Sequence, residues 1–147
     1  VDGAVAGYVL YAPPAYLPGL AAYATSPVSG DAVALATLHV DPAHAGAGLG
    51  RMLVQGMTAD LARRGVRAVE AVASTSGADI CLIPADFLLA VGFTTVRAHP
   101  RHPRLRLDLR QTVVGFMRDD VVEAALDRLL GRGRVGAPGL QREEPLA

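Results

Sequence analysis

The stretch that decides the fold is LHVDPAHAGAGLGR, residues 38–51, in which an apolar segment runs into three glycines at alternate positions. Gly46, Gly48 and Gly50 leave backbone N–H groups uncovered just before a predicted helix, and such a concave set of amides binds phosphate. A tight turn without a ligand is the alternative interpretation. Two other phosphate motifs are excluded, because the chain has no Lys for a phosphate-binding loop and Arg51 stands where a dinucleotide fingerprint needs Gly.

On both sides of this stretch, the apolar pattern predicts a strand, a helix and a second strand. Residues 32–40 form an apolar segment that an Asp-Pro pair ends. After the glycines, apolar residues recur four apart, and Gly65 supplies a left-handed stop for the helix. Residues 66–73 are apolar again. Strands joined through one helix are parallel, so we expect an α/β domain with a mixed sheet.

The remaining segments complete a single predicted domain over residues 1–130, with its core in residues 1–110. We expect strands at 4–11, 20–25, 94–99 and 105–109, a short helix at 85–91 and an amphipathic helix at 119–130. Residues 131–147 are rich in Gly, Pro and charge, which predicts a flexible tail.

The composition excludes several classes of chemistry. All fourteen basic residues are Arg and fourteen residues are acidic, so the 147-residue chain is formally neutral and cannot supply a Schiff-base Lys. The single Cys excludes an internal disulfide and a multi-Cys metal site, and no apolar run approaches the ~20 residues that span a membrane. We therefore expect a cytoplasmic protein that needs no metal. Residues 51–110 carry nine Arg against five acidic residues, which would attract an anion.

The same stretch resembles motif A of the GNAT N-acetyltransferase superfamily, in which a strand ending in Val-Asp-Pro leads through a Gly-rich loop into a long helix. The matching residues are Val40-Asp41-Pro42, Gly48 and Gly50 and, further along the chain, Gly92-Phe93. The likeness covers residues 1–110. It implies a GNAT-like fold with central splayed parallel strands, of which a longer parent chain would supply the first strand and the first helices.

In that family, the pyrophosphate of acetyl-CoA lies on the Gly-rich loop and the pantetheine arm runs between the two splayed strands. The resemblance implies that acetyl-CoA is the co-substrate and that segments 32–40 and 66–73 are the splayed pair. Backbone groups of Leu38 and Val40 would pair with the pantetheine amides and polarise the thioester carbonyl. The implied cofactor-binding residues are Leu38, His39, Val40, Ala45, Gly46, Ala47, Gly48, Leu49, Gly50 and Arg51.

Three positions depart from the family pattern. The Arg or Gln at the head of the loop is Ala45 here, so Arg51 would have to supply its contact with phosphate. The tyrosine that protonates the leaving CoA thiolate in many members is Leu88, which has no proton to donate. The Asn that often opens the same helix corresponds to Cys81.

Three residues are candidate acids or bases, and each has a structural alternative. His39 lies beside the expected thioester and suits base catalysis near neutral pH, or it is a strand histidine with a backbone or solvent partner. Cys81, near a helix N-terminus, could act as acid or nucleophile, or it is a small buried residue. Glu70 could order a water as a base, or it is an exposed strand charge.

Basic residues also gather around the predicted hairpin between segments 94–99 and 105–109. This cluster would bind an acidic acceptor, the 3′-phosphate of CoA or RNA, or it is the charged surface of an exposed hairpin. No aromatic residues separate the basic ones, so we expect no nucleic-acid partner. The cluster consists of Arg97, His99, Arg101, His102, Arg104 and Arg106.

Together these features predict an N-acetyltransferase that moves the acetyl group of acetyl-CoA to a primary amine by direct attack in a ternary complex. The sequence does not identify the acceptor, a small molecule or a protein amine. The departures at Ala45 and Leu88 favour an alternative, a non-catalytic acyl-CoA-binding sensor or assembly domain of the same fold. A third hypothesis is an interaction domain that forms a homodimer through helix 119–130.

Overall fold

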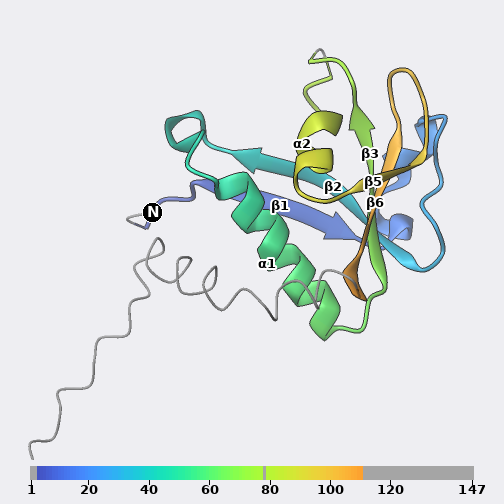
Figure 1. The fold of residues 1–147 in the computed structure, drawn as a ribbon, viewed down its shortest axis with the longest axis horizontal. Coiled ribbons are helices and arrows are strands. Elements are labelled where there is room, and N and C mark those ends of the chain that lie inside the picture. The colour runs from blue at the N-terminus through green and yellow to red at the C-terminus, as the bar shows by residue number, and fades with distance from the viewer. Residues whose placement is uncertain (1–2, 78, 111–147) are drawn as a thin grey trace, which may run out of the picture.

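The computed structural model describes residues 3–77 and 79–110, which form a mixed six-stranded sheet with helices (Figure 1). The strand order is β1 (Gly7–Ala12), β2 (Ala32–Val40), β3 (Ala68–Ser74), β6 (Arg104–Asp108) and β5 (Thr94–Arg97). A short strand, β4 (Ile83–Pro84), pairs with β3 outside this path. β2 and β3 are parallel, whereas the β1–β2, β3–β6 and β5–β6 pairs are antiparallel. The predicted mixed α/β fold is confirmed. The predicted helix 119–130 and tail 131–147 lie outside the described residues.

The first two strands lie at one edge of the sheet. β1 (Gly7–Ala12) begins later than the predicted strand 4–11, whereas β2 (Ala32–Val40) has the predicted limits. Their register shifts between Leu10 and Tyr11, which pair with Thr37 and Leu35, respectively. The extra residue in β2 makes a bulge, and a bulge bends and twists the strand that contains it.

The segment between β1 and β2 contains no strand, so the predicted strand at 20–25 is wrong. Two 3₁₀ helices lie there instead, η1 (Pro14–Tyr16) and η2 (Pro18–Ala22). Each begins with Pro, whose fixed φ favours the first position of a helical turn and which lacks the N–H that a strand ladder needs. The segment then reaches the β5–β6 hairpin, where the hydroxyl of Thr25 donates to the carbonyl of His102 at 2.8 Å.

Helix α1 (Leu49–Arg63) covers one face of the sheet at β1 and β2 (Figure 1). Its buried apolar residues Val54, Met57 and Leu61 recur three and four apart, so they share one side of the helix and join the core. Gly65 adopts a φ of 75° just after the helix, as the left-handed stop requires. The predicted helix is confirmed.

Strand β3 (Ala68–Ser74) is buried along its whole length in the middle of the sheet. Alternate residues of this strand join the core cluster with α1 and α2, namely Val69, Ala71 and Ala73. Because side chains alternate along a strand, the others point to the opposite side of the sheet, here called the polar face. These residues are Ala68, Glu70, Val72 and Ser74.

The remaining elements follow β3 along the chain. They are β4 (Ile83–Pro84), α2 (Ala85–Ala90), β5 (Thr94–Arg97) and β6 (Arg104–Asp108). Gly92, with a φ of 106°, ends the turn after α2, and Phe93 is buried beside it in the core. The predicted helix 85–91 and the two predicted strands are confirmed, with ends that shift by one or two residues.

Candidate active site

The Gly-rich loop joins β2 to α1 and is exposed. A short 3₁₀ helix, η3 (Pro42–His44), opens it, and Asp41 Oδ1 accepts a hydrogen bond from the N–H of Ala43 at 2.8 Å. Gly46 and Gly48 have φ values of 81° and 79°, a region that residues with side chains rarely adopt. A Cβ at either glycine would meet no atom within 4 Å. The backbone here is therefore open to close approach by a ligand.

Helix α1 begins without a side-chain cap. Gly48 precedes it in the left-handed conformation and helical residues follow, so successive N–H groups converge as in an anion-binding nest. The helix dipole adds partial positive charge at the same end. The exposed guanidinium of Arg51 lies in the first turn, where its Nη2 donates to the carbonyl of Ala90 at 3.4 Å. The loop thus offers an anion backbone donors, a dipole and one cation.

A close contact joins the start of α1 to α2. A Cβ on Gly50 would lie 3.0 Å from Cε2 and 3.1 Å from Cζ of Phe87, closer than side-chain carbons normally approach. Glycine at this position therefore allows the Phe87 ring to pack against the first turn of α1. Gly50 is predicted from the sequence as a phosphate-binding residue, whereas the only sequence signal for Phe87 is an aromatic residue in the predicted helix 85–91.

Strands β2 and β3 separate beside the loop. They pair only at Ala32↔Ala68, Val33↔Val69 and Ala34↔Glu70. Beyond this point β3 pairs with β4. The opposite edge of β3 is bonded to the β5–β6 hairpin, where the N–H of Ala73 donates to the carbonyl of Pro103 at 2.9 Å. β4 therefore lies on the edge of β3 that β2 has left. The central splayed parallel strands are therefore confirmed. Beside Leu38 and Val40, the edge of β2 that faces β3 has no strand partner among the described residues.

The predicted acids and bases lie in different surroundings. His39 is exposed and points to the polar face, with its ring centroid 5.4 Å from that of Tyr8. Cys81 is exposed in the turn before β4, so the alternative that it is a small buried residue is wrong. Leu88 is fully buried in the core, and its apolar side chain has no proton to donate.

Glu70 is fully buried on the polar face, so the expected exposed strand charge is wrong. Its Oε1 accepts from Arg106 Nη1 at 3.1 Å, and its Oε2 accepts from Ser29 N–H at 2.9 Å and forms an ion pair with Arg104 Nε at 3.3 Å. Burial would raise the pKa of Glu70, but the hydrogen bonds from Ser29 and Arg106 and the Arg104 charge hold that pKa below its ordinary value. Both oxygens are occupied, so the geometry does not support a base at Glu70.

The basic cluster of the hairpin is not a uniform charged surface. Arg106 makes a bidentate pair with Asp31, with Nη1–Oδ1 and Nη2–Oδ2 both 2.9 Å. Arg104 and Arg106 are therefore engaged by carboxylates on the polar face, whereas Arg97 and Arg101 are exposed. The interpretation of the cluster as the charged surface of an exposed hairpin is thus wrong for Arg104 and Arg106.

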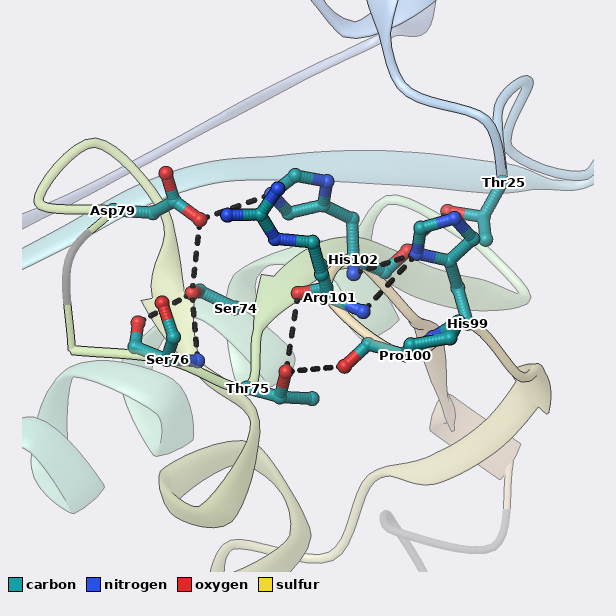
Figure 2. Close-up of polar contacts among 9 residues, drawn as sticks. All are labelled: Thr25, Ser74, Thr75, Ser76, Asp79, His99, Pro100, Arg101 and His102. Carbon is teal, nitrogen blue, oxygen red and sulfur yellow. Dashed lines mark hydrogen bonds and ion pairs between the residues drawn. The ribbon is translucent and has the colours of Figure 1, made fainter.

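Asp79 and His102 form a pair that the sequence analysis missed (Figure 2). His102 Nε2 lies 2.9 Å from Asp79 Oδ2, and the hydroxyl oxygen of Ser74 lies 3.3 Å from the same carboxylate oxygen. The hydrogen bond from His102 is the main cause that lowers the pKa of Asp79. The two residues are 23 positions apart, so only the fold brings them together.

Comparison with known proteins identifies the family. The sequence profile of the Acetyltransferase (GNAT) family matches residues 1–79, more than half of the 147-residue chain, so the chain belongs to the GNAT acetyltransferase family. A structure described as a GNAT-family acetyltransferase from Desulfovibrio desulfuricans is 23% identical, with a TM-score of 0.54 over 74% of this chain and 64% of that one.

Two further structures share the fold. An acetyltransferase from Thermus thermophilus is 21% identical, with a TM-score of 0.52 over 73% of this chain and 58% of that one. Nourseothricin acetyltransferase is 18% identical, with a TM-score of 0.53 over 74% and 60%. The chain thus spans less than two thirds of each of these three proteins.

One comparison and two properties of the structure gave negative findings. No curated protein matches the sequence significantly. Within residues 3–77 and 79–110, no helix is long and apolar enough to cross a membrane. In the same part of the chain, no three His, Cys, Asp or Glu side chains are grouped to hold a metal ion.

Proposed function

We propose that this protein is an N-acetyltransferase that transfers the acetyl group of acetyl-CoA to a primary amine by direct attack in a ternary complex. The observation that carries the proposal is the exposed loop at Gly46 and Gly48, which enters α1 uncapped beside two strands that splay apart. Membership of the GNAT family supports acetyl-CoA as the acetyl donor.

The loop has the properties that a pyrophosphate site needs. The N–H groups of residues 46–51 would hold the pyrophosphate of acetyl-CoA, because the left-handed glycines let an anion approach the backbone closely. Ala45, at the family's Arg or Gln position, is exposed and offers no side-chain donor. Binding at this site therefore rests on backbone donors, the dipole of α1 and the exposed Arg51.

The free edge of β2 would bind the pantetheine arm through backbone groups of Leu38 and Val40. A backbone N–H directed at the thioester oxygen would stabilise the negative charge that develops as the amine attacks. The C–N bond forms, the C–S bond breaks, its electron pair leaves with the CoA sulfur, and the attacking amine releases one N–H proton. A thiol with an ordinary pKa of about 8.5 leaves readily as thiolate and takes its proton from water. Transfer is therefore compatible with the apolar Leu88.

His39 and Cys81 are retained as candidates for proton transfer, because both side chains are exposed. The variants His39→Ala and Cys81→Ala test them through the pH dependence of kcat/KM. A residue that titrates in the reaction should reshape that profile when it is removed. A wild-type profile in a variant would exclude the replaced residue from proton transfer.

A second function is favoured by two observations, the buried Leu88 and the missing side-chain donor at Ala45. A domain with these features could bind acyl-CoA as a sensor or assembly module without turning it over. Such a domain would show saturable acetyl-CoA binding and no release of CoA thiol with any primary amine.

Isothermal titration with acetyl-CoA tests the binding step. Gly48→Glu introduces a bulky anion into the nest and should abolish binding. Gly56→Glu is the matched control, because Gly56 is exposed in α1 about two turns further along and a Cβ there meets no atom within 4 Å. Absence of binding by the wild-type protein would contradict the proposal, and CoA-thiol release with a panel of primary amines separates the enzyme from the sensor.

A further inference from the structure

A polar cluster lies at the carboxyl end of β3, outside the Gly-rich loop (Figure 2). The hydroxyl of Ser74, the last residue of β3, donates to the carbonyl of Ser76 at 2.6 Å and accepts from the N–H of Ser76 at 3.2 Å, and its oxygen lies 3.3 Å from Asp79 Oδ2. Asp79 Oδ2 also lies 2.9 Å from His102 Nε2. The cluster therefore joins the loop after β3 to the β5–β6 hairpin through one carboxylate.

The imidazole of His102 is held on several sides. The backbone N–H of His102 donates to Nδ1 of His99 at 3.0 Å, and its carbonyl accepts from the Thr25 hydroxyl at 2.8 Å. The His99 ring stacks on the His102 ring at 5.9 Å with an interplanar angle of 6°, and the Tyr23 ring meets it edge-on at 5.1 Å. Contacts from three segments thus fix the orientation of the ring.

This orientation decides which nitrogen of His102 can accept a proton. An ionised Asp79 accepts the Nε2–H hydrogen, so in the neutral imidazole the lone pair is on Nδ1. The hydrogen bonds from His102 and Ser74 lower the pKa of Asp79, and the carboxylate stays charged near neutral pH. The His102 side chain keeps 23% of its surface exposed.

The cluster and the Gly-rich loop lie at the same edge of the sheet. β2 and β3 are parallel and run toward this edge before they splay apart, and the loop follows β2 whereas the cluster follows β3. Ligands of such sheets bind in the crevice outside the carboxyl ends of strands that separate. Ser74 points to the polar face, opposite α1 and α2. A donor on the loop and an acceptor beside the cluster would therefore reach the splayed strands from different sides.

We propose that His102, oriented by Asp79, is the base that deprotonates the acceptor amine. The inference rests on the proposed acetyl transfer. His102 Nδ1 takes one proton from the ammonium form of the acceptor and passes it to solvent. The neutral amine attacks the thioester carbonyl carbon, the C–N bond forms and the C–S bond breaks. The second N–H proton ends on the CoA sulfur, so the products are an acetamide, CoA thiol and one released proton.

Asp79 is a positioning residue in this scheme, since it acts through His102. Its negative charge stabilises the imidazolium that forms when His102 accepts the proton. The other ionisable groups that face the pair are Arg101 and His99 on the hairpin and Tyr23 on the segment after β1.

The variant His102→Gln separates the base from a merely structural link. Gln can donate a hydrogen bond to Asp79 but cannot accept a proton at neutral pH. We expect kcat/KM with a reactive primary amine such as benzylamine to fall about 10²- to 10⁴-fold and to lose the rise with pH that a histidine base gives it. Asp79→Asn should also lower kcat/KM and move the apparent pKa of the rise. Thr95→Ala, which changes an exposed side chain on the same hairpin, should change neither quantity.

Two further measurements, of acetyl-CoA binding and of the His102 tautomer, make the outcome decisive. Acetyl-CoA binding by calorimetry should be the same in wild-type, His102→Gln and Asp79→Asn proteins, and its absence from the wild type would refute the transfer reaction itself. If His102→Gln binds acetyl-CoA normally and keeps the wild-type kcat/KM, the assignment of His102 as the base is refuted, whereas the transfer reaction is not. Long-range ¹H–¹⁵N spectra need no acceptor and should show neutral His102 protonated at Nε2, and an Nδ1–H tautomer would overturn the proposal.

Discussion

Replacing Glu70 by Gln tests whether this carboxylate stabilises the sheet or takes part in the reaction. Gln has nearly the same size but no charge, and it keeps one oxygen acceptor. In either amide orientation its NH₂ group faces a donor, either Arg106 or the pair of Ser29 and Arg104. The substitution therefore removes a charge and leaves at least one guanidinium or backbone donor without its acceptor.

The structure sets the size of the effect. Glu70 has no exposed side-chain surface, and the side chains of Arg104 and Arg106 are 14% and 21% exposed. Removing one member of so buried an ion pair costs about 3 kcal/mol of unfolding free energy. For a chain of this length that lowers Tm by roughly 10 °C.

The stability that the Glu70→Gln variant loses should depend on pH. Because its partners hold the pKa of Glu70 below the ordinary value in the folded protein, the carboxylate stabilises the fold above the unfolded pKa, and this contribution is lost as the pH falls through the folded pKa. The Tm difference between wild type and Glu70→Gln should be full at neutral pH and should shrink below about pH 4.

Scanning calorimetry between about pH 7 and pH 3 measures both effects. Asp31→Asn is the matched control, since Asp31 binds the same Arg106 but has a 41% exposed side chain, and it should lose less stability. At a temperature where Glu70→Gln is folded, acetyl transfer should proceed as in the wild type. An unchanged Tm, or a Tm difference that grows in acid, would refute the reasoning, and a folded but inactive variant would make Glu70 a reaction residue.

Three further predictions concern other parts of the structure. Gly48→Ala should lower the free energy of unfolding by about 1 kcal/mol, because Gly48 has a left-handed φ. Gly56→Ala, within α1, should raise the free energy of unfolding by about 0.5–1 kcal/mol. Equal effects of the two variants in urea unfolding would contradict the assigned conformations. Leu88→Ala should cost about 2–5 kcal/mol in the same assay, and wild-type stability would mean that Leu88 is not in the core. The Tyr11 hydroxyl donates to Asp60 at 2.6 Å, and burial and Asp60 should raise the pKa of Tyr11 in an ultraviolet titration. The variant Tyr11→Phe identifies which titration step belongs to Tyr11, and an ordinary pKa for that step would contradict the contact.

The central strand–loop–helix unit could be predicted from the sequence because its signals are local. These signals are the apolar run of β2, the glycines of the loop and the apolar residues that recur four apart in α1, and they lie within a few residues of one another. The predicted limits of β2 and the predicted left-handed stop at Gly65 are confirmed. The segment after β1 was not predicted correctly, because its prolines impose 3₁₀ turns on a stretch whose apolar residues favour a strand. Its path is set by distant contacts such as Thr25 to His102.

The polar residues of the site were harder to predict, since their roles depend on partners far away in the sequence. Glu70 looked like a free charge because Asp31, Arg104 and Arg106 reach it only in the folded sheet. His102 was visible as a basic hairpin residue, but its pairing with Asp79 required the ends of two separate elements to meet. The conformation of the Gly-rich loop depends on no such partner, because Gly46 and Gly48 themselves permit its left-handed turns.

The central claim is that the amides of the Gly-rich loop hold the pyrophosphate of acetyl-CoA. A titration of the ¹⁵N-labelled protein with acetyl-CoA, followed by ¹H–¹⁵N correlation spectra, tests this directly. We predict that the largest amide shifts fall on residues 46–51, that inorganic pyrophosphate reproduces them in part, and that Gly48→Glu removes them. Saturable binding of acetyl-CoA with unshifted amides at residues 46–51 would contradict the account.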